Sequence, residues 1–114
     1  MNKISYDGRN FRSVEDSTTG EVSRETVFQY HQVGDIVTAE YCGGDIVSGH
    51  LIAICDANGC LDMRYHHINA KGDLMTGRCR STPEISADGR IRLHEMWQWT
   101  SGDMSSGTSK LEEV

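Results

Sequence analysis

Glu95, Trp97 and Trp99 are the residues whose types and spacing could do chemistry. They lie two positions apart within residues 91–100, and side chains two apart on a β-strand share one face. If that face points into the protein, the Glu95 carboxylate needs a donor, a water molecule or a proton, because an unpaired buried charge is costly. Indoles beside a few polar groups are typical of a small-molecule site. This spacing therefore indicates a ligand pocket.

Polar and aromatic side chains on other expected strands could face Glu95 and complete the pocket. We predict that seven residues bind a small molecule without catalysis: Ser13, Tyr41, Tyr65, His67, Glu95, Trp97 and Trp99. A second interpretation stays open, in which the tyrosines and tryptophans fill the core and Glu95 belongs to a structural hydrogen-bond network.

Recognised motifs for catalysis, metal binding and phosphate binding are absent from the sequence. In an enzyme, Glu95 would act as acid or base together with His67, and a nucleophilic Cys79 would need His67 as its base. The adjacent His66 and His67 would face opposite sides of a strand, and no H-x-x-x-H or His/Cys spacing predicts zinc. No glycine-rich phosphate loop occurs. We expect no metal and no cofactor.

Length and charge limit the class of protein. A chain of 114 residues favours one domain that spans residues 1–114. A net charge of −6 disfavours nucleic acid and anionic membranes as partners. No basic-then-apolar signal segment opens the chain, and no apolar run approaches the roughly 20 residues that span a bilayer. We therefore expect a cytoplasmic protein whose four cysteines are free thiols.

Turn-forming residues divide the chain into short segments that alternate apolar and polar side chains. Segments 26–30, 36–41, 61–68 and 91–100 have the period of two that a half-buried strand requires. Segment 45–55 is apolar on both sides, so its faces are not assigned. Pro83 should end the strand that holds Cys79 and Ser81, and a short helix over 93–100 is an alternative to the last strand. The expected turns lie at 17–20, 33–35, 43–45, 56–59, 69–72, 87–89 and 101–103.

The number of strands favours closure of the sheet. About eight strands joined only by hairpins would leave two long edges if the sheet stayed flat, and closure removes them. About eight strands also enclose either packed side chains or one small ligand. The predicted fold is therefore all-β, a single small antiparallel up-and-down β-barrel of about eight strands.

Four runs of the chain resemble a family of short bacterial proteins. The likeness covers nearly the whole chain, and its members are often labelled N-acetylglutamate synthase. That label implies an acetyl-CoA-dependent amino-acid N-acetyltransferase with an α/β fold and an R/Q-x-x-G-x-G/A loop before a helix, a loop that this sequence lacks. The runs are Asp62-Met63-Arg64-Tyr65, GDLMTG at 72–77, Ser81-Thr82-Pro83-Glu84 and GRIRLHEMWQWTSGD at 89–103.

Residues 90–102 also resemble the Trp-bearing strand of avidin and streptavidin, which ends in W-x-x-T-S-G. This resemblance implies an eight-stranded avidin-like or calycin-like barrel that binds biotin at one open end. It places Trp97 at a ligand-stacking tryptophan and Trp99 at the next inward position. Residues 38–41 (TAEY) are similar to the family's T-G-T-Y strand, which places Tyr41 at a ligand-contacting tyrosine; Ser13 and His67 are also placed at the site. The hairpin after Thr100 is shorter than in avidins.

Three classes of function stay open. The first is a small-ligand binder, and because avidin-like barrels often associate, the resemblance implies a homo-oligomer. The second is an enzyme, either a barrel hydrolase or isomerase that uses Glu95, or the acetyltransferase of the label. The third is a structural or interaction protein with a filled core and an apolar outer patch.

Overall fold

The structure is a computed structural model that describes residues 4–14 and 20–114. These residues contain no helix, and hence none long and apolar enough to cross a membrane. The strands are β1 (Asn10–Ser13), β2 (Val27–Val33), β3 (Ile36–Gly43), β4 (Ile46–Cys55), β5 (Leu61–Asn69), β6 (Leu74–Ile85), β7 (Ile91–Trp99) and β8 (Ser106–Glu113).

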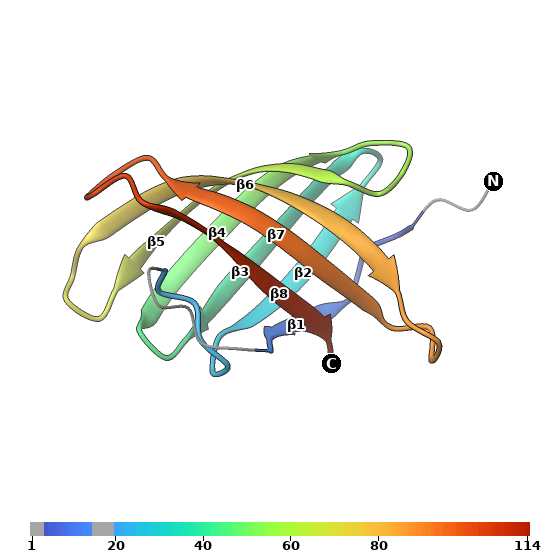
Figure 1. Cartoon of the computed structure of the whole chain (residues 1–114), viewed down its shortest axis with the longest axis horizontal. Coiled ribbons are helices and arrows are strands. Elements are labelled where there is room, and N and C mark those ends of the chain that lie inside the picture. The colour runs from blue at the N-terminus through green and yellow to red at the C-terminus, as the bar shows by residue number, and fades with distance from the viewer. Residues whose placement is uncertain (1–3, 15–19) are drawn as a thin grey trace.

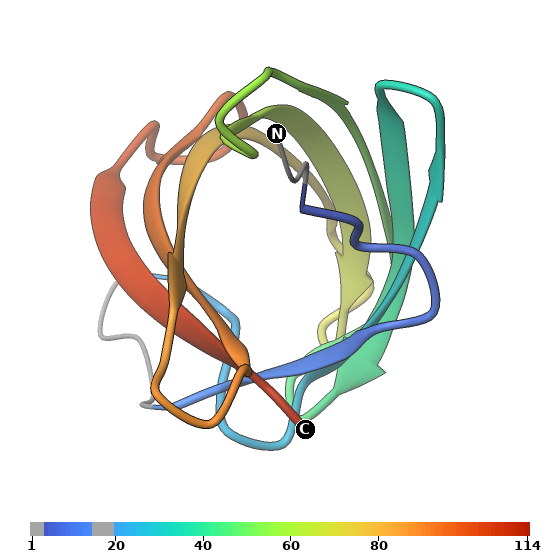
Figure 2. The same cartoon turned by 90° about the vertical axis from the view of Figure 1, so that its right-hand side faces the viewer.

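The strands form a closed barrel in the order of the sequence (Figure 1). Each strand pairs antiparallel with the next, and β8 pairs with β1 from Phe11–Glu113 to Ser13–Leu111, which closes the ring seen end-on in Figure 2. The predicted all-β, up-and-down barrel is therefore confirmed. The α/β fold implied by the N-acetylglutamate synthase label is not found in the described residues.

Alternate side chains of each strand point into the barrel, as the period of two predicted. On β5, Leu61, Met63 and His67 are buried, whereas Asp62 and Arg64 between them are exposed. On β4, the pairing register with β5 shifts between Ile46 and Ser48. This irregularity, together with apolar residues on the outer wall, explains why periodicity could not assign the faces of segment 45–55.

The end predicted for β6 was wrong. This strand does not stop at Pro83 but continues to Ile85. Pro83 pairs with Leu93 of β7, whereas the pairing of β6 with β5 ends at Ser81. A proline is tolerated at this position because β5 no longer runs beside it and no partner there needs its missing N–H.

Residues 91–99 form a strand, as predicted, and not the short helix that was the alternative over 93–100. Residues of β7 pair with β6 on one side and β8 on the other. The hairpins turn at the glycine-containing sites that the sequence indicated, with Gly34, Gly44, Gly59, Gly72, Gly89 and Gly102 at positive φ. Residues 17–19 of the first expected turn lie outside the described residues.

The segment before β1 closes one end of the barrel. Tyr6 is fully buried, and its Oη donates a hydrogen bond of 2.5 Å to the carbonyl of Gly59 in the β4–β5 turn. Its ring centroid lies 5.9 Å from that of Tyr30 and 6.4 Å from that of Phe11. This aromatic cluster seals the apolar core, and it leaves the opposite end of the barrel as the place for a site.

Candidate functional site

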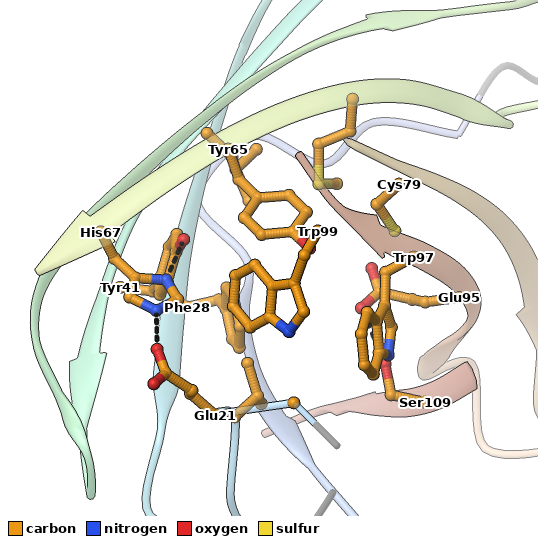
Figure 3. Close-up of a pocket in the computed structure, with 14 residues that line it drawn as sticks. Glu21, Phe28, Tyr41, Tyr65, His67, Cys79, Glu95, Trp97, Trp99 and Ser109 are labelled. Atoms are coloured by element: carbon orange, nitrogen blue, oxygen red, sulfur yellow. Dashed lines mark hydrogen bonds and ion pairs between the residues drawn. The ribbon is translucent and has the colours of Figure 1, made fainter. Parts of the chain in front are cut away.

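A cavity occupies the end of the barrel away from Tyr6 (Figure 3). Its volume is about 50 Å³, which is small beside the roughly 300–1,000 Å³ of pockets that hold drug-sized ligands. It is lined by Gly20, Glu21, Val22, Phe28, Tyr41, Leu51, Met63, Tyr65, His67, Cys79, Glu95, Trp97, Trp99 and Ser109.

Strand β7 contributes three successive inward side chains to the cavity wall, as predicted. The rings of Trp97 and Trp99 lie 5.8 Å apart, centroid to centroid, at 60°. The ring of Tyr65 on β5 packs edge-on against Trp99 at 5.7 Å. Trp99 is buried, whereas Trp97 and Tyr65 are partly exposed at the cavity. Three aromatic rings therefore line the same small space.

Glu95 is buried in this wall between two serines. The register of β7 places it opposite Ser81 of β6 and Ser109 of β8. Ser81 Oγ donates to Glu95 Oε2 at 2.7 Å and Ser109 Oγ donates to Oε1 at 3.4 Å. Burial raises the pKa of Glu95, and the hydrogen bonds from the two serines oppose this shift only in part.

A second polar network lies across the cavity from Glu95. Nε2 of His67 lies 2.7 Å from Oε1 of Glu21, and Nδ1 of the same ring lies 3.0 Å from Oη of Tyr41. The Tyr41 hydroxyl also donates to the carbonyl of His66 at 3.3 Å, so Glu21, His67 and Tyr41 form one hydrogen-bonded chain. Asn69 Nδ2 donates to the other Glu21 oxygen at 2.8 Å. The residues that line the cavity from the β1–β2 loop are thereby attached to β5.

Three glycines make room for the aromatic side chains of the site. Tyr41 lies opposite Gly49, Tyr65 opposite Gly77, and Trp97 opposite Gly107 in the strand register; the glycines belong to β4, β6 and β8. A β-carbon on any of these glycines would overlap the ring on the neighbouring strand. Each ring lies over a glycine across the sheet, and the pairing register sets its position.

Cys79 lies on the same wall as Glu95 but is not activated. Its Sγ lies 3.8 Å from Oγ of Ser81. Burial raises the pKa of the Cys79 thiol, and the nearby Glu95 raises it further. A neutral thiol is a poor nucleophile, and no hydrogen bond joins Cys79 to His67 among the described residues.

The structure brings six of the seven predicted site residues together around one cavity and leaves out Ser13. Ser13 is buried on β1, opposite Leu111 of β8, and does not line the cavity. The most important lining residue that sequence reasoning missed is Glu21. It precedes β2 in a segment without periodicity, so no pattern in the chain indicated that its carboxylate binds His67.

Histidines do come together elsewhere, on the outer wall of the barrel. His50 of β4 pairs with His66 of β5, and their ring centroids lie 5.7 Å apart. Across residues 4–14 and 20–114, however, no group of three or more His, Cys, Asp or Glu side chains has the geometry to hold a metal ion.

Comparison with known proteins agrees with this architecture. The family model described as avidin-like protein matches residues 4–114. No curated protein and no solved structure matches the chain. The match covers nearly the whole chain, and the structure is a closed eight-stranded up-and-down barrel. The chain belongs to the avidin-like protein family.

Proposed function

We propose that this barrel binds a small molecule at its open end without catalysing a reaction on it. The observation that carries the proposal is the cavity wall, in which Trp97, Trp99 and Tyr65 surround a space that also meets the buried carboxyl of Glu95. Apolar walls with few polar groups are the usual composition of a ligand site. Membership of the avidin-like family supports the same function.

The size of the cavity limits what can enter without rearrangement. At about 50 Å³ it holds a small molecule or the head of a larger one. A ligand as large as biotin would extend out of this cavity or displace part of its wall, and Gly20, Glu21 and Val22 are the wall residues that belong to no strand.

Binding can be measured directly, because the chain has only two tryptophans and both line the cavity. Candidate small molecules, with biotin and choline among them, should change the tryptophan fluorescence and raise the melting temperature. A ligand at 100 times its Kd stabilises the folded state by about 2.7 kcal/mol. If no compound of a broad metabolite panel changes either signal, the filled-core interpretation replaces this proposal.

An enzyme is the second candidate, favoured by one observation. His67 lies between the carboxylate of Glu21 and the hydroxyl of Tyr41, an order of groups that activates nucleophiles in other proteins. Burial raises the pKa of Tyr41, which opposes its ionisation, and for this reason we place catalysis second. An assay with acetyl-CoA and glutamate tests the N-acetylglutamate synthase activity. If turnover of any substrate is found and is lost in His67→Gln, catalysis becomes the first candidate function and binding the second.

Association into a homo-oligomer is also proposed, as the avidin resemblance implies. An exposed apolar surface on β2, β3 and β4 supports it, with Val33, Ile36, Ile52 and Ile54 between 54% and 82% exposed. Light scattering after size-exclusion chromatography should give a multiple of the 12.7 kDa chain mass. A single 12.7 kDa species at high concentration would contradict it.

A further inference from the structure

Within residues 4–14 and 20–114, the buried carboxyl of Glu95 has hydrogen-bond donors but no cation beside it. Ser81 and Ser109 each donate to one of its oxygens. The salt bridges of the described residues involve other carboxylates, Glu21 among them, and none joins a Lys, Arg or His to Glu95. Two neutral donors compensate a buried carboxylate less completely than an ion pair does. A positive charge in the cavity would therefore be stabilised.

The remaining wall beside Glu95 consists of aromatic rings. Trp97, Trp99 and Tyr65 present their rings to one space, and Figure 3 shows the Glu95 carboxylate directed into it next to Trp97. The faces of aromatic rings attract cations, and tryptophan does so most strongly. An anion placed here would meet both the ring faces and the carboxylate, so this wall selects against negative ligands.

Size restricts the cation to a compact one. The volume of about 50 Å³ is far below the roughly 300–1,000 Å³ of pockets for drug-sized ligands, which favours a compact group such as a methylated nitrogen. No group of three or more His, Cys, Asp or Glu side chains in the described part of the chain could hold a bare metal ion, whereas an alkylated nitrogen gains apolar contact with the aromatic walls. The net charge of −6 also favours the approach of cations over anions.

We propose that the cavity binds the alkylated ammonium group of a small organic cation, with Trp97, Trp99 and Tyr65 as its walls and Glu95 as its counter-ion. This inference rests on the proposed binding function and names the ligand class for it. Glu21, the other carboxylate at the cavity, already accepts from His67 and Asn69, so Glu95 is the carboxylate that determines the preference for a cation.

Binding of a cation should depend on pH. Burial raises the pKa of Glu95, and a bound cation favours the ionised form, so affinity should increase as the pH rises and Glu95 loses its proton. The other titratable groups that face the interior near Glu95 from the surrounding elements have raised pKa values and remain neutral over this range. They are Tyr6, Tyr30 of β2, Tyr41 of β3, Tyr65 of β5 and Cys79 of β6. Across the cavity, His67 and Glu21 form their own pair.

The test compares choline with 3,3-dimethylbutan-1-ol, in which a carbon atom replaces the charged nitrogen without changing the shape. Isothermal titration and tryptophan fluorescence should show choline binding at least tenfold more tightly than the alcohol, with higher affinity at higher pH. Equal binding of the two compounds would overturn the cation inference and leave the binding function standing. If neither compound binds and the metabolite panel with biotin is also silent, both proposals fail.

Variants then locate the charge that matters. Glu95→Gln keeps the size of the side chain and a carbonyl acceptor for the serines, and it should lower choline affinity at least tenfold while leaving affinity for the alcohol unchanged. Glu40→Gln removes a carboxylate from the exposed outer wall, so it is the matched control and should leave both affinities unchanged. If Glu21→Gln removes the preference for choline and Glu95→Gln does not, the assignment to Glu95 is wrong. Circular dichroism and melting temperature verify that each variant is folded.

Discussion

Gly77 of β6 lies opposite Tyr65 of β5, and the tyrosine ring occupies the space that any larger side chain at 77 would need. A β-carbon on Gly77 would overlap Cζ and Oη of Tyr65. Tyr65 in turn packs edge-on against Trp99. The absence of a side chain at Gly77 thus determines the positions of two aromatic rings that line the cavity, Tyr65 and Trp99.

Gly77→Ala should therefore displace Tyr65 and change the cavity. The far end of the ring can shift, so we expect a loss of about 1–3 kcal/mol in the free energy of unfolding, as for other overpacked sites, and altered tryptophan fluorescence. In a Tyr65→Leu background the same substitution should cost less, because the overlapping ring atoms are gone. Equal costs in the two backgrounds, measured by urea denaturation, would show that the ring is not what Gly77 accommodates.

Two inward tyrosines on neighbouring strands should respond differently to loss of their hydroxyl group. The Oη of Tyr30 is buried without a hydrogen-bond partner among the described residues, whereas Tyr41 Oη lies 3.0 Å from Nδ1 of His67 and donates to the carbonyl of His66 at 3.3 Å. Tyr30→Phe should leave the free energy of unfolding unchanged or raise it by up to about 1 kcal/mol. Tyr41→Phe should lower it by about 1–3 kcal/mol, because Nδ1 of His67 and the carbonyl of His66 lose a hydrogen-bond partner. A clear loss of stability in Tyr30→Phe would indicate a buried water bound to that hydroxyl.

Glu95 should make the stability of the protein fall as the pH rises. Burial raises its pKa in the folded state, so between the ordinary carboxyl pKa and this raised value the folded state holds a proton that the unfolded chain has lost. The free energy of unfolding decreases across that window and is unaffected by Glu95 below it. Glu95→Gln removes this pH dependence. Relative to the wild type, its free energy of unfolding should increase by about 1–3 kcal/mol as the pH rises, because that is the cost of an incompletely compensated buried group.

Glu84 provides the control for that titration. It is exposed, and the hydrogen bond from His94 lowers its pKa, so it contributes stability that is lost as the pH falls. Relative to the wild type, the stability of Glu84→Gln should therefore decrease as the pH rises, whereas that of Glu95→Gln should increase. Melting temperatures of the three proteins from about pH 3 to about pH 9 give the comparison, since the ordinary Glu pKa is about 4.3. A pH-independent difference for Glu95→Gln would mean that Glu95 does not titrate differently on folding.

Glu21 should hold the wall at the mouth of the cavity in place. Its carboxylate binds His67, which is 1% exposed, and Asn69. Glu21→Ala should increase the quenching of tryptophan fluorescence by acrylamide and lower the free energy of unfolding by about 1–3 kcal/mol, because two buried donors lose their acceptor. Glu40→Ala is the matched control, since Glu40 also binds a histidine, His31, but on the exposed outer wall, where such pairs contribute about 0–1 kcal/mol. Similar effects of the two substitutions would rule out a special role for Glu21.

The sequence by itself determined the barrel and the inward face of most strands. A period of two decides which side chains share a face, as on β5 and β7, and hairpin turns at short intervals leave few ways to arrange eight strands. Both patterns are local in the sequence, so they can be recognised without knowing which strands pair. The extent of β6 past Pro83 was missed because it depends on where the neighbouring strand β5 ends.

Only the tertiary structure decided how the inward side chains meet. Pairing register places Ser81 and Ser109 on either side of Glu95 and sets Gly77 beneath Tyr65. The contact of Glu21 with His67 joins residues 46 positions apart, and no periodicity carries that information. Residue types and alternation indicated an inward Glu95 beside two tryptophans, and the closure of the sheet supplied the two serines and the aromatic walls that surround it.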